Sequence, residues 1–382
     1  MKIHRLYSLL LFLIIHKWAF AQTEIEPGVL YVKLNNSSTL QSEKTLSLTH
    51  IKGLERYTPL KTNTSALRIT ASIIDGLYKI EVSKETDIRA LCDSLESYGN
   101  VLYAEPIYQE QLLYLPNDPA IAAGSQSYLN IIKAFEAWDI TRGDSSMIIG
   151  ISDTGVDYFH PDLVNKMHVN EEDPPNGIDD DGNGYIDDYR GYDFADQDTS
   201  ALPGSNYHGT RVAGIAGAET DNGFGMAGVG INAKLAALKI FKSESGTAAN
   251  TYESIIYAAD NGYDVINLSW GSANSYTQAA QDIINYAVEE KNLIVIGAAG
   301  NTPEDLEFYP ASYDNVLSVA STENNDTKAS FSSYSYQVDI SAPGRAIYGT
   351  TSNDGFTSGD GTSFSSPQVA GAAALVNVGY TY

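Results

Sequence analysis

The sequence predicts an α/β protein, in which a parallel sheet flanked by helices follows a small α+β unit. From about residue 116, short and almost uninterrupted apolar runs alternate with stretches that carry apolar residues at helical spacing. Such alternation is typical of right-handed βαβ units, whose strands are covered on both faces. Before residue 116, strand-like segments surround one amphipathic helix. In the larger part, ligands are expected beyond the carboxyl ends of the parallel strands.

Composition excludes several classes of protein. The 382 residues include 23 basic and 48 acidic side chains, for a formal charge of -25, with 43% hydrophobic residues and one cysteine. General disorder is excluded because the apolar content suffices for packed domains. Nucleic acid is not an expected partner, since its phosphates would be repelled. A single cysteine allows no intrachain disulfide, so the fold needs another source of stability.

Residues 1–21 have the pattern of a secretory signal peptide. Lys2 and Arg5 precede a short apolar run, and Ala19-Phe20-Ala21 forms an A-x-A cleavage site. We therefore expect cleavage after Ala21 and a secreted, extracellular protein of bacterial type. A buried N-terminal helix is the alternative. Every other apolar run is too short to cross a bilayer, so we expect no integral membrane segment.

Residues 22–115 are predicted to form the small α+β unit. Its expected strands cover residues 29–34, 76–82 and 101–106, and its helix covers residues 86–98. Cys92 lies on the apolar stripe of that helix, which favours a buried structural thiol over a reactive one. In the larger unit, strands are expected at residues 146–152, 235–240, 265–269, 293–297 and 316–320, and helices at residues 250–262 and 276–291.

Three segments of the larger unit carry the residue types of nucleophilic catalysis. Asp153 follows an apolar strand, His208 opens a helix of small residues, and Ser363 precedes another helix. Pro367 is expected in about the first turn of that helix, where a missing N–H is least costly. Taken singly, these residues could be a turn residue, a surface or core histidine and a helix cap. Together they supply an orienting carboxylate, a base and a hydroxyl nucleophile.

In the order Asp, His, Ser, the three segments resemble the motifs of the subtilisin-like serine proteases (subtilases, peptidase family S8), over about residues 118–382. The resemblance implies an endopeptidase that acts on proteins or peptides. Ser363 would attack, with His208 as general base and Asp153 orienting the imidazole. It also implies that Asn301, with the backbone N–H of Ser363, stabilises the oxyanion. His160 matches a family motif as well, and the role it implies is structural.

The resemblance further implies that an extended substrate binds between two segments of the chain. These are Ser269, Trp270 and Gly271 on one side and Ala298, Ala299 and Gly300 on the other. Phe308 occupies a position at which broad-specificity members carry a glycine on the floor of the pocket for the residue before the cut. We therefore predict a preference for small or medium side chains in that pocket.

The acidic residues are concentrated in one stretch, in which Glu171 to Asp198 contains 11 acidic side chains and one arginine. Residues 179–190 have the oxygen spacing of an EF-hand-like loop, with a glycine at position 6. Arg190 takes the place of the bidentate glutamate at position 12, and flanking helices are not evident. We predict structural Ca²⁺, and a solvated acidic turn is the alternative. The expected ligands are Asp179, Asp181, Asn183, Tyr185 through its carbonyl, and Asp187, and Asp118 resembles a ligand of a second family site.

The resemblance also implies how the chain is processed. Residues 22–115 occupy the place of an inhibitory propeptide, which would assist folding, block the cleft and be cut off between Gln109 and Asn117; a retained accessory domain is the alternative. Residues 116–382 would be a catalytic domain, expected to be truncated at its C-terminus and monomeric. Two other functions compete, a catalytically silent, calcium-stabilised binding or adhesion module and a related hydrolase of esters.

Overall fold

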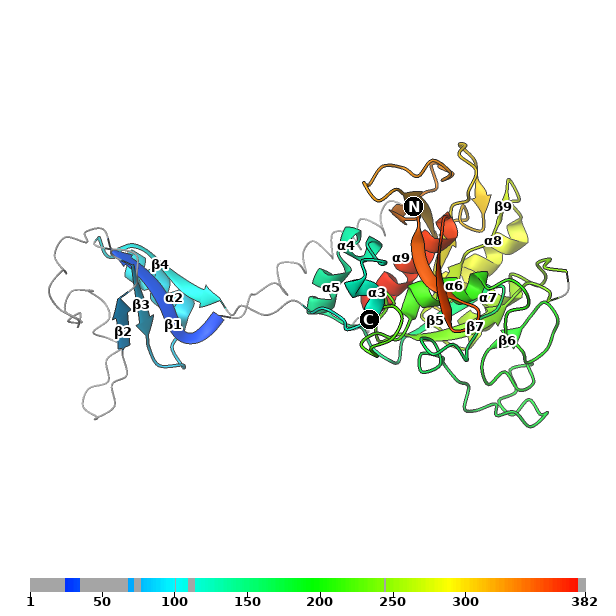
Figure 1. Ribbon diagram of the computed structural model, residues 1–382, viewed down its shortest axis with the longest axis horizontal. Coiled ribbons are helices and arrows are strands. Elements are labelled where there is room, and N and C mark those ends of the chain that lie inside the picture. The colour runs from blue at the N-terminus through cyan, green and yellow to red at the C-terminus, as the bar shows by residue number, and fades with distance from the viewer. Residues whose placement is uncertain are drawn as a thin grey trace. The chain divides into compact units, whose positions relative to one another are not determined.

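A computed structural model describes residues 25–34, 68–71, 77–99, 101–108, 114–243 and 245–376. The chain divides into two compact units, residues 1–112 and 113–382 (Figure 1). The expected signal peptide, most of the expected cleavage segment between the units, and residues 377–382 lie outside the described residues. No helix in the described ranges is long and apolar enough to cross a membrane.

The described residues of the first unit form an antiparallel sheet and the helix α2 (Ile88–Glu96). The strand order is β2 (Arg68–Ala71), β3 (Leu77–Glu81), β1 (Ile25–Leu34) and β4 (Val101–Tyr108). The helix begins where the Asp87 side chain accepts the N–H of Ala90 at 3.1 Å, which caps its first turn. Leu91 and Leu95 of α2 pack against buried residues of the sheet. The three strands and the helix expected in residues 22–115 are all present.

Cys92 is buried in the same core, 5% exposed, which confirms the expected buried thiol. Burial raises its pKa to about 11, and nearby acidic side chains contribute to the rise. A thiol with so high a pKa is almost entirely protonated at neutral pH and therefore a poor nucleophile.

The second unit is built on a seven-stranded sheet in which all neighbouring strands are parallel. The order is β13 (Ile340–Pro343), β12 (Val316–Thr322), β10 (Ile294–Ala298), β8 (Val265–Leu268), β5 (Ile148–Asp153), β7 (Lys234–Lys239) and β6 (Tyr192–Asp193). The predicted α/β class is thus confirmed, and five of these strands match the expected apolar runs. β6 has only two residues and the first half of β13 is exposed, so neither produced a clear apolar run.

Helices cover both faces of this sheet (Figure 1). One core cluster joins α6 and α9 to strand residues such as Ile149 and Ile151. The other joins α7 and α8 to strand residues such as Leu238 and Ile266. The helices of this unit are α3 (Pro119–Ala122), α4 (Tyr128–Ile131), α5 (Ala134–Ile140), α6 (His208–Gly217), α7 (Glu253–Asp260), α8 (Gln278–Asn285), the π-helical turn η3 (Tyr286–Glu290) and α9 (Thr362–Val376).

Two short antiparallel pairs lie outside the main sheet, β9 (Ser272–Ala273) with β11 (Phe308–Tyr309), and β14 (Ile347–Thr351) with β15 (Gly355–Gly359). The expectation for Pro367 needs correction, because this residue lies in the second turn of α9 and not in the first. A proline there leaves the carbonyl of Ser363 without its helical donor. The hydroxyl of Ser269 replaces that donor, 2.9 Å from the Ser363 oxygen.

Candidate active site

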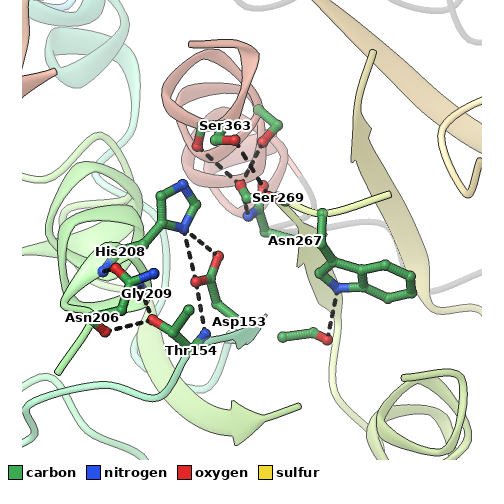
Figure 2. A network of polar contacts seen from close by, with 11 residues as sticks. Asp153, Thr154, Asn206, His208, Gly209, Asn267, Ser269 and Ser363 are labelled. Atoms are coloured by element: carbon green, nitrogen blue, oxygen red, sulfur yellow. Dashed lines mark hydrogen bonds and ion pairs between the residues drawn. The ribbon is translucent and has the colours of Figure 1, made fainter. Parts of the chain in front are cut away.

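The fold brings Asp153, His208 and Ser363 together at the carboxyl ends of the strands. Asp153 is the last residue of β5, His208 the first of α6, and Ser363 the second of α9. The Nδ1 atom of His208 lies 2.8 and 3.0 Å from the two carboxylate oxygens of Asp153. Figure 2 shows the imidazole between this carboxylate and the start of α9, where Ser363 lies. Three residues far apart in the sequence therefore form one cluster.

Thr154 holds the start of α6 against the end of β5. Its hydroxyl donates to the carbonyl of Asn206 and accepts the N–H of Gly209, both at 2.9 Å (Figure 2). Its own N–H donates to Asp153 Oδ1 at 2.7 Å. Gly209 permits the close approach, because a Cβ there would lie 2.9 Å from the Cβ of Asp153. This role of Thr154 was not expected from the sequence, although the residue directly follows Asp153.

The carboxylate of Asp153 stabilises the protonated form of His208. Burial by itself would lower the pKa of His208, but the negative charge of Asp153 and its hydrogen bond outweigh burial and raise it. Asp153 is only 1% exposed, so its charge acts on the imidazole with little screening by water. The pair can therefore take up a proton at His208 and stabilise the resulting imidazolium.

Ser363 and Asn301 are held by backbone and side-chain contacts around the start of α9. The hydroxyl of Ser363 donates to the carbonyl of Ser269 at 3.3 Å. Asn301 Oδ1 accepts both the N–H and the hydroxyl of Thr362, at 2.8 and 3.0 Å. These two bonds occupy the oxygen of the amide and leave its NH₂ group free to donate elsewhere. Thr362 is thus a positioning residue that sequence analysis missed, although it directly precedes Ser363.

The two expected walls of the cleft follow neighbouring parallel strands. Ser269 to Gly271 come directly after β8, and Ala298 to Gly300 begin at the end of β10. The side chain of Trp270 donates to the hydroxyl of Ser152 at 3.1 Å and packs on the core cluster of α7 and α8. Its indole therefore anchors the first wall to the body of the unit.

A model of the subtilase family matches residues 144–381, which is more than half of the chain. The chain belongs to the subtilase family. It is 38% identical over 299 residues to a thermophilic serine proteinase of Bacillus sp. strain AK1, covering 78% of this chain and 68% of that protein. It is 40% identical over 267 residues to thermitase of Thermoactinomyces vulgaris, covering 69% of this chain and 85% of thermitase.

The fold of this chain also matches solved structures of proteases. A protease structure from Pseudoalteromonas arctica matches with a TM-score of 0.55 and 30% identity, covering 69% of this chain and 86% of that chain. The resemblance found in the sequence is thereby confirmed, and this subtilase is a serine-type endopeptidase.

In this subtilase the ring of Phe308 lies between the two walls. A Cβ on Gly271 would lie 2.5 Å from Phe308 Cε1, and one on Gly300 would lie 2.9 Å from its Cδ2. β11, which begins with Phe308, pairs with β9 directly after the first wall. The aromatic side chain therefore occupies space that a smaller residue at position 308 would leave open.

Asp118 lies in a buried acidic cluster with Asp162. Asp118 is 1% exposed, and its Oδ1 atom has no hydrogen-bond partner among the described residues. Although Asp118 precedes α3, its side chain makes no capping bond.

Burial raises the pKa of Asp162 to about 7, and the nearby charges of Asp118 and Glu219 contribute. A hard cation would satisfy the orphaned oxygen and offset the buried charge, so this cluster fits Ca²⁺. Asp162 was not among the ligands expected from the sequence.

In the acidic loop at residues 170–188, unlike at Asp118, the carboxylates accept hydrogen bonds from the loop itself. Asp179 accepts the N–H groups of Asn183 and Gly184, at 3.1 and 2.9 Å. Asp181 accepts the side-chain amides of Asn170 and Asn183, at 2.9 and 3.0 Å. The carboxylate of Asp187 is turned to the start of the loop, where it accepts the N–H groups of residues 176 and 177, at 2.9 and 2.8 Å.

Two further acidic residues complete this loop. Asp173 and Asp188, both almost fully buried, hold the loop together and were not expected from the spacing. Within the described ranges, no three His, Cys, Asp or Glu side chains gather as a metal-binding group. Amide and carbonyl oxygens would therefore have to complete the shell of any bound cation.

His160 has the structural role that the resemblance implied. It is fully buried, and its Nε2 lies 3.1 Å from the carbonyl of Gly355. Its Nδ1 accepts the N–H of Asp162 at 3.1 Å. Nε2 thus links this turn to the hairpin of β14 and β15, Nδ1 stabilises the turn itself, and neither nitrogen is available for catalysis.

Proposed function

We propose that this subtilase hydrolyses peptide bonds with Ser363 as nucleophile, His208 as general base and Asp153 as the residue that orients and stabilises the imidazole. The observation that carries the proposal is the two-oxygen contact of Asp153 with His208 Nδ1 beside the start of α9. That contact favours the tautomer of the neutral imidazole that carries its proton on Nδ1, in which Nε2 is the atom that can accept a proton.

The reaction then proceeds in two stages. The hydroxyl of Ser363 turns from the Ser269 carbonyl towards His208 Nε2, gives up its proton and forms a bond to the carbonyl carbon of the substrate. His208 next donates that proton to the departing amine, which breaks the peptide bond and leaves an acyl-enzyme. In the second stage, water gives a proton to His208 and forms a bond to the acyl carbon. His208 then returns the proton to Ser363 Oγ as the ester bond breaks, which releases the acid and restores the enzyme.

The negative oxygen of each tetrahedral intermediate needs preorganised donors. The N–H of Ser363 lies in the first turn of α9, where N–H groups have no partner within the helix. The NH₂ group of Asn301 is the second donor, since Thr362 occupies the amide oxygen. These donors are set before the reaction begins, which is the source of their effect on rate.

The substrate binds as an extended strand between the walls at residues 269–271 and 298–300. The position of the Phe308 ring supports a shallow pocket and thus a preference for small or medium side chains before the cut. Pairing through the main chain of both walls favours peptides over simple esters as substrates.

Ca²⁺ serves as a structural cofactor in this proposal. The orphaned Oδ1 of Asp118 and the neighbouring Asp162 are the strongest support, and the oxygen-rich loop at residues 179–187 is a further candidate. A bound cation would supply charge compensation and additional links between loops, with no part in the chemical steps.

The protein is exported and made as a zymogen in the same proposal. The leader pattern of residues 1–21 supports secretion. The separate compact unit before residue 113 supports a propeptide that inhibits the monomeric enzyme until it is removed. If Ser363→Ala accumulated in the fully processed form without added protease, self-processing would be refuted.

Labelling with a fluorophosphonate serine probe tests the catalytic proposal against the silent binding module. We expect label on Ser363, none on Ser363→Ala, and hydrolysis of an alanine-rich peptide by the wild type alone. Ser365→Ala is not a suitable control, because the hydroxyl of Ser365 is buried and hydrogen-bonded. Ser335→Ala changes a half-buried loop residue outside the catalytic cluster, and it should be labelled like the wild type. Absence of both label and hydrolysis in a folded, calcium-loaded protein would favour the silent module.

A further inference from the structure

Arg211 is a cation beside His208, and it takes no part in the mechanism proposed above. It lies one turn after His208 on α6. Its guanidinium carbon lies 5.1 Å from the ring centre of Phe364, the residue after the nucleophile. The rings of His208 and Phe364 are themselves 5.4 Å apart. The arginine is therefore held near the reacting groups.

The hairpin of β14 and β15 makes room for this side chain. A Cβ on Gly349 would lie 2.5 Å from Arg211 Cγ, and a Cβ on Gly359 would lie 2.5 Å from its Nη1. Any larger residue at either position would displace the arginine. Arg211 thus occupies a defined slot between α6 and the hairpin.

Among the described residues, Arg211 lacks a counter-charge. Its Nε atom is buried with no hydrogen-bond partner, and no described carboxylate forms an ion pair with it. Arg345, which also stacks on a phenylalanine ring, is paired with Glu323 and Asp360 instead. An arginine without such a partner is able to bind a carboxylate with two parallel hydrogen bonds.

A pocket of about 390 Å³ gives access to the arginine. Asn206, Tyr207 and His208 line one side, Thr351 and Ser352 line another, and Arg211 is the permanently charged residue of the lining. Figure 2 shows Asn206 and His208 on one side of Asp153, with Ser269 of the first wall on the other. The lining includes no residue of either wall.

The position of the pocket identifies the part of the substrate that enters it. The walls hold the acyl side of the substrate, and His208 must face the departing amine in order to protonate it. A pocket that shares His208 but neither wall therefore receives the leaving-group side.

We propose that Arg211 binds a substrate carboxylate on the leaving-group side of the cut, so that the enzyme favours an acidic group within the first three residues after the scissile bond. The proposal rests on the catalytic function proposed above. The carboxylate comes from an aspartate or glutamate side chain or from a nearby free C-terminus, and peptides can distinguish these two sources.

Paired peptides of otherwise identical sequence test the preference. One set, amidated at the C-terminus, carries Glu or Gln at the first, second or third position after the cut. The second set has neutral side chains at these positions. Its peptides end at the first, second or third residue after the cut, either as a free acid or as an amide. In one of these pairs we expect kcat/KM of the wild type to be about tenfold higher for the charged member. The ratio should fall in 1 M salt, which screens the exposed part of the interaction.

Variants then assign the preference to Arg211. Arg211→Gln should bring the ratio to about 1, and Arg211→Lys should retain part of it. Arg142→Gln is the matched control, since Arg142 also stacks on an aromatic ring, 3.8 Å from the centre of Tyr114, and its loss changes the net charge equally. A ratio near 1 in the wild type for every pair would overturn the proposal, as would a ratio that Arg211→Gln leaves unchanged. Because the neutral peptides report catalysis itself, their failure to be cut would count against the catalytic function instead.

Discussion

The catalytic cleft and the acidic loop at residues 170–188 are both dense in polar side chains, but they use their hydrogen bonds in opposite ways. In the cleft, a partner holds the back of a group and leaves its functional atom free, as Thr362 holds the oxygen of Asn301 and leaves its NH₂ group. In the loop, carboxylates such as Asp179 and Asp181 accept N–H and amide groups of the loop itself.

This difference predicts that substitutions in the cleft and in the loop affect different properties, activity in the first case and stability in the second. Groups that are held from behind act on a substrate, so their loss should reduce activity with little effect on folding. Groups that bind one another maintain the shape of the loop, so their loss should reduce stability with little effect on turnover. The four predictions below test this separation.

The largest expected effect is that of Asn301→Ala. Loss of a preorganised donor to the oxyanion should lower kcat about 10²- to 10³-fold with little change in KM. The melting temperature should fall by only about 2–4 °C, because Asn301 itself is exposed and the main loss is the acceptor for the N–H and hydroxyl of buried Thr362. Steady-state kinetics and calorimetry measure both quantities. A loss confined to KM would show that Asn301 binds substrate and does not act in the transition state.

Phe308→Gly should change specificity more than rate. Removing the ring from between Gly271 and Gly300 deepens the pocket, so kcat/KM for peptides with Phe before the cut should rise about tenfold relative to Ala. Phe308→Leu, which retains most of the volume, is the control and should change the ratio less. A wild-type enzyme that already prefers Phe would contradict the shallow pocket.

Calcium should affect stability without affecting the chemical steps. In the Ser363→Ala background, which prevents autolysis, a chelator should lower the melting temperature by about 5–10 °C. Asp118→Asn should abolish most of this calcium response, since it alters a buried oxygen that has no protein partner. Asp181→Asn, in the loop, should reduce it less. Equal melting curves with and without calcium would eliminate the structural cation.

The smallest expected effect is a shift in pH dependence. Activity requires neutral His208, whose pKa is raised, so kcat/KM should fall on the acid side around a pH above the ordinary histidine value of about 6.5. The protonated pair with Asp153 stabilises the fold below the unfolded-state pKa, and this contribution is lost as pH rises through the folded-state pKa. Asp153→Asn should move the imidazole titration, measured by NMR in Ser363→Ala, to lower pH. An unchanged titration would refute the electrostatic role of Asp153.

The sequence was sufficient for the parts of the fold that rest on regular patterns. Buried strands such as residues 265–268 are uninterrupted apolar runs, and the helix that contains Cys92 has a clear apolar stripe, so both were predicted. β6 could not be predicted, because a two-residue strand is defined by its neighbour β7 and not by its own residues. The position of Pro367 was misjudged because its compensation comes from Ser269, which is distant in the sequence.

The candidate site was also predictable only where its residues lie in recognisable sequence motifs. Asp153, His208 and Ser363 lie in extended motifs, whereas the roles of Thr154 and Thr362 depend on contacts made only after folding. Asp162 was missed because its significance comes from burial beside Asp118. Spacing along the chain located oxygen-rich segments, but it could not show which oxygens the protein itself satisfies.

The hydroxyl of Ser269 has a consequence for how this chain can evolve. Because it replaces the donor that Pro367 lacks, substitutions at the two positions should not be independent. Ser269→Ala leaves the Ser363 carbonyl without this donor as long as residue 367 is proline, but would be better tolerated after Pro367→Ala restores an N–H. The order in which these changes arise would then decide whether a lineage passes through an impaired intermediate, so the two positions are expected to show epistasis.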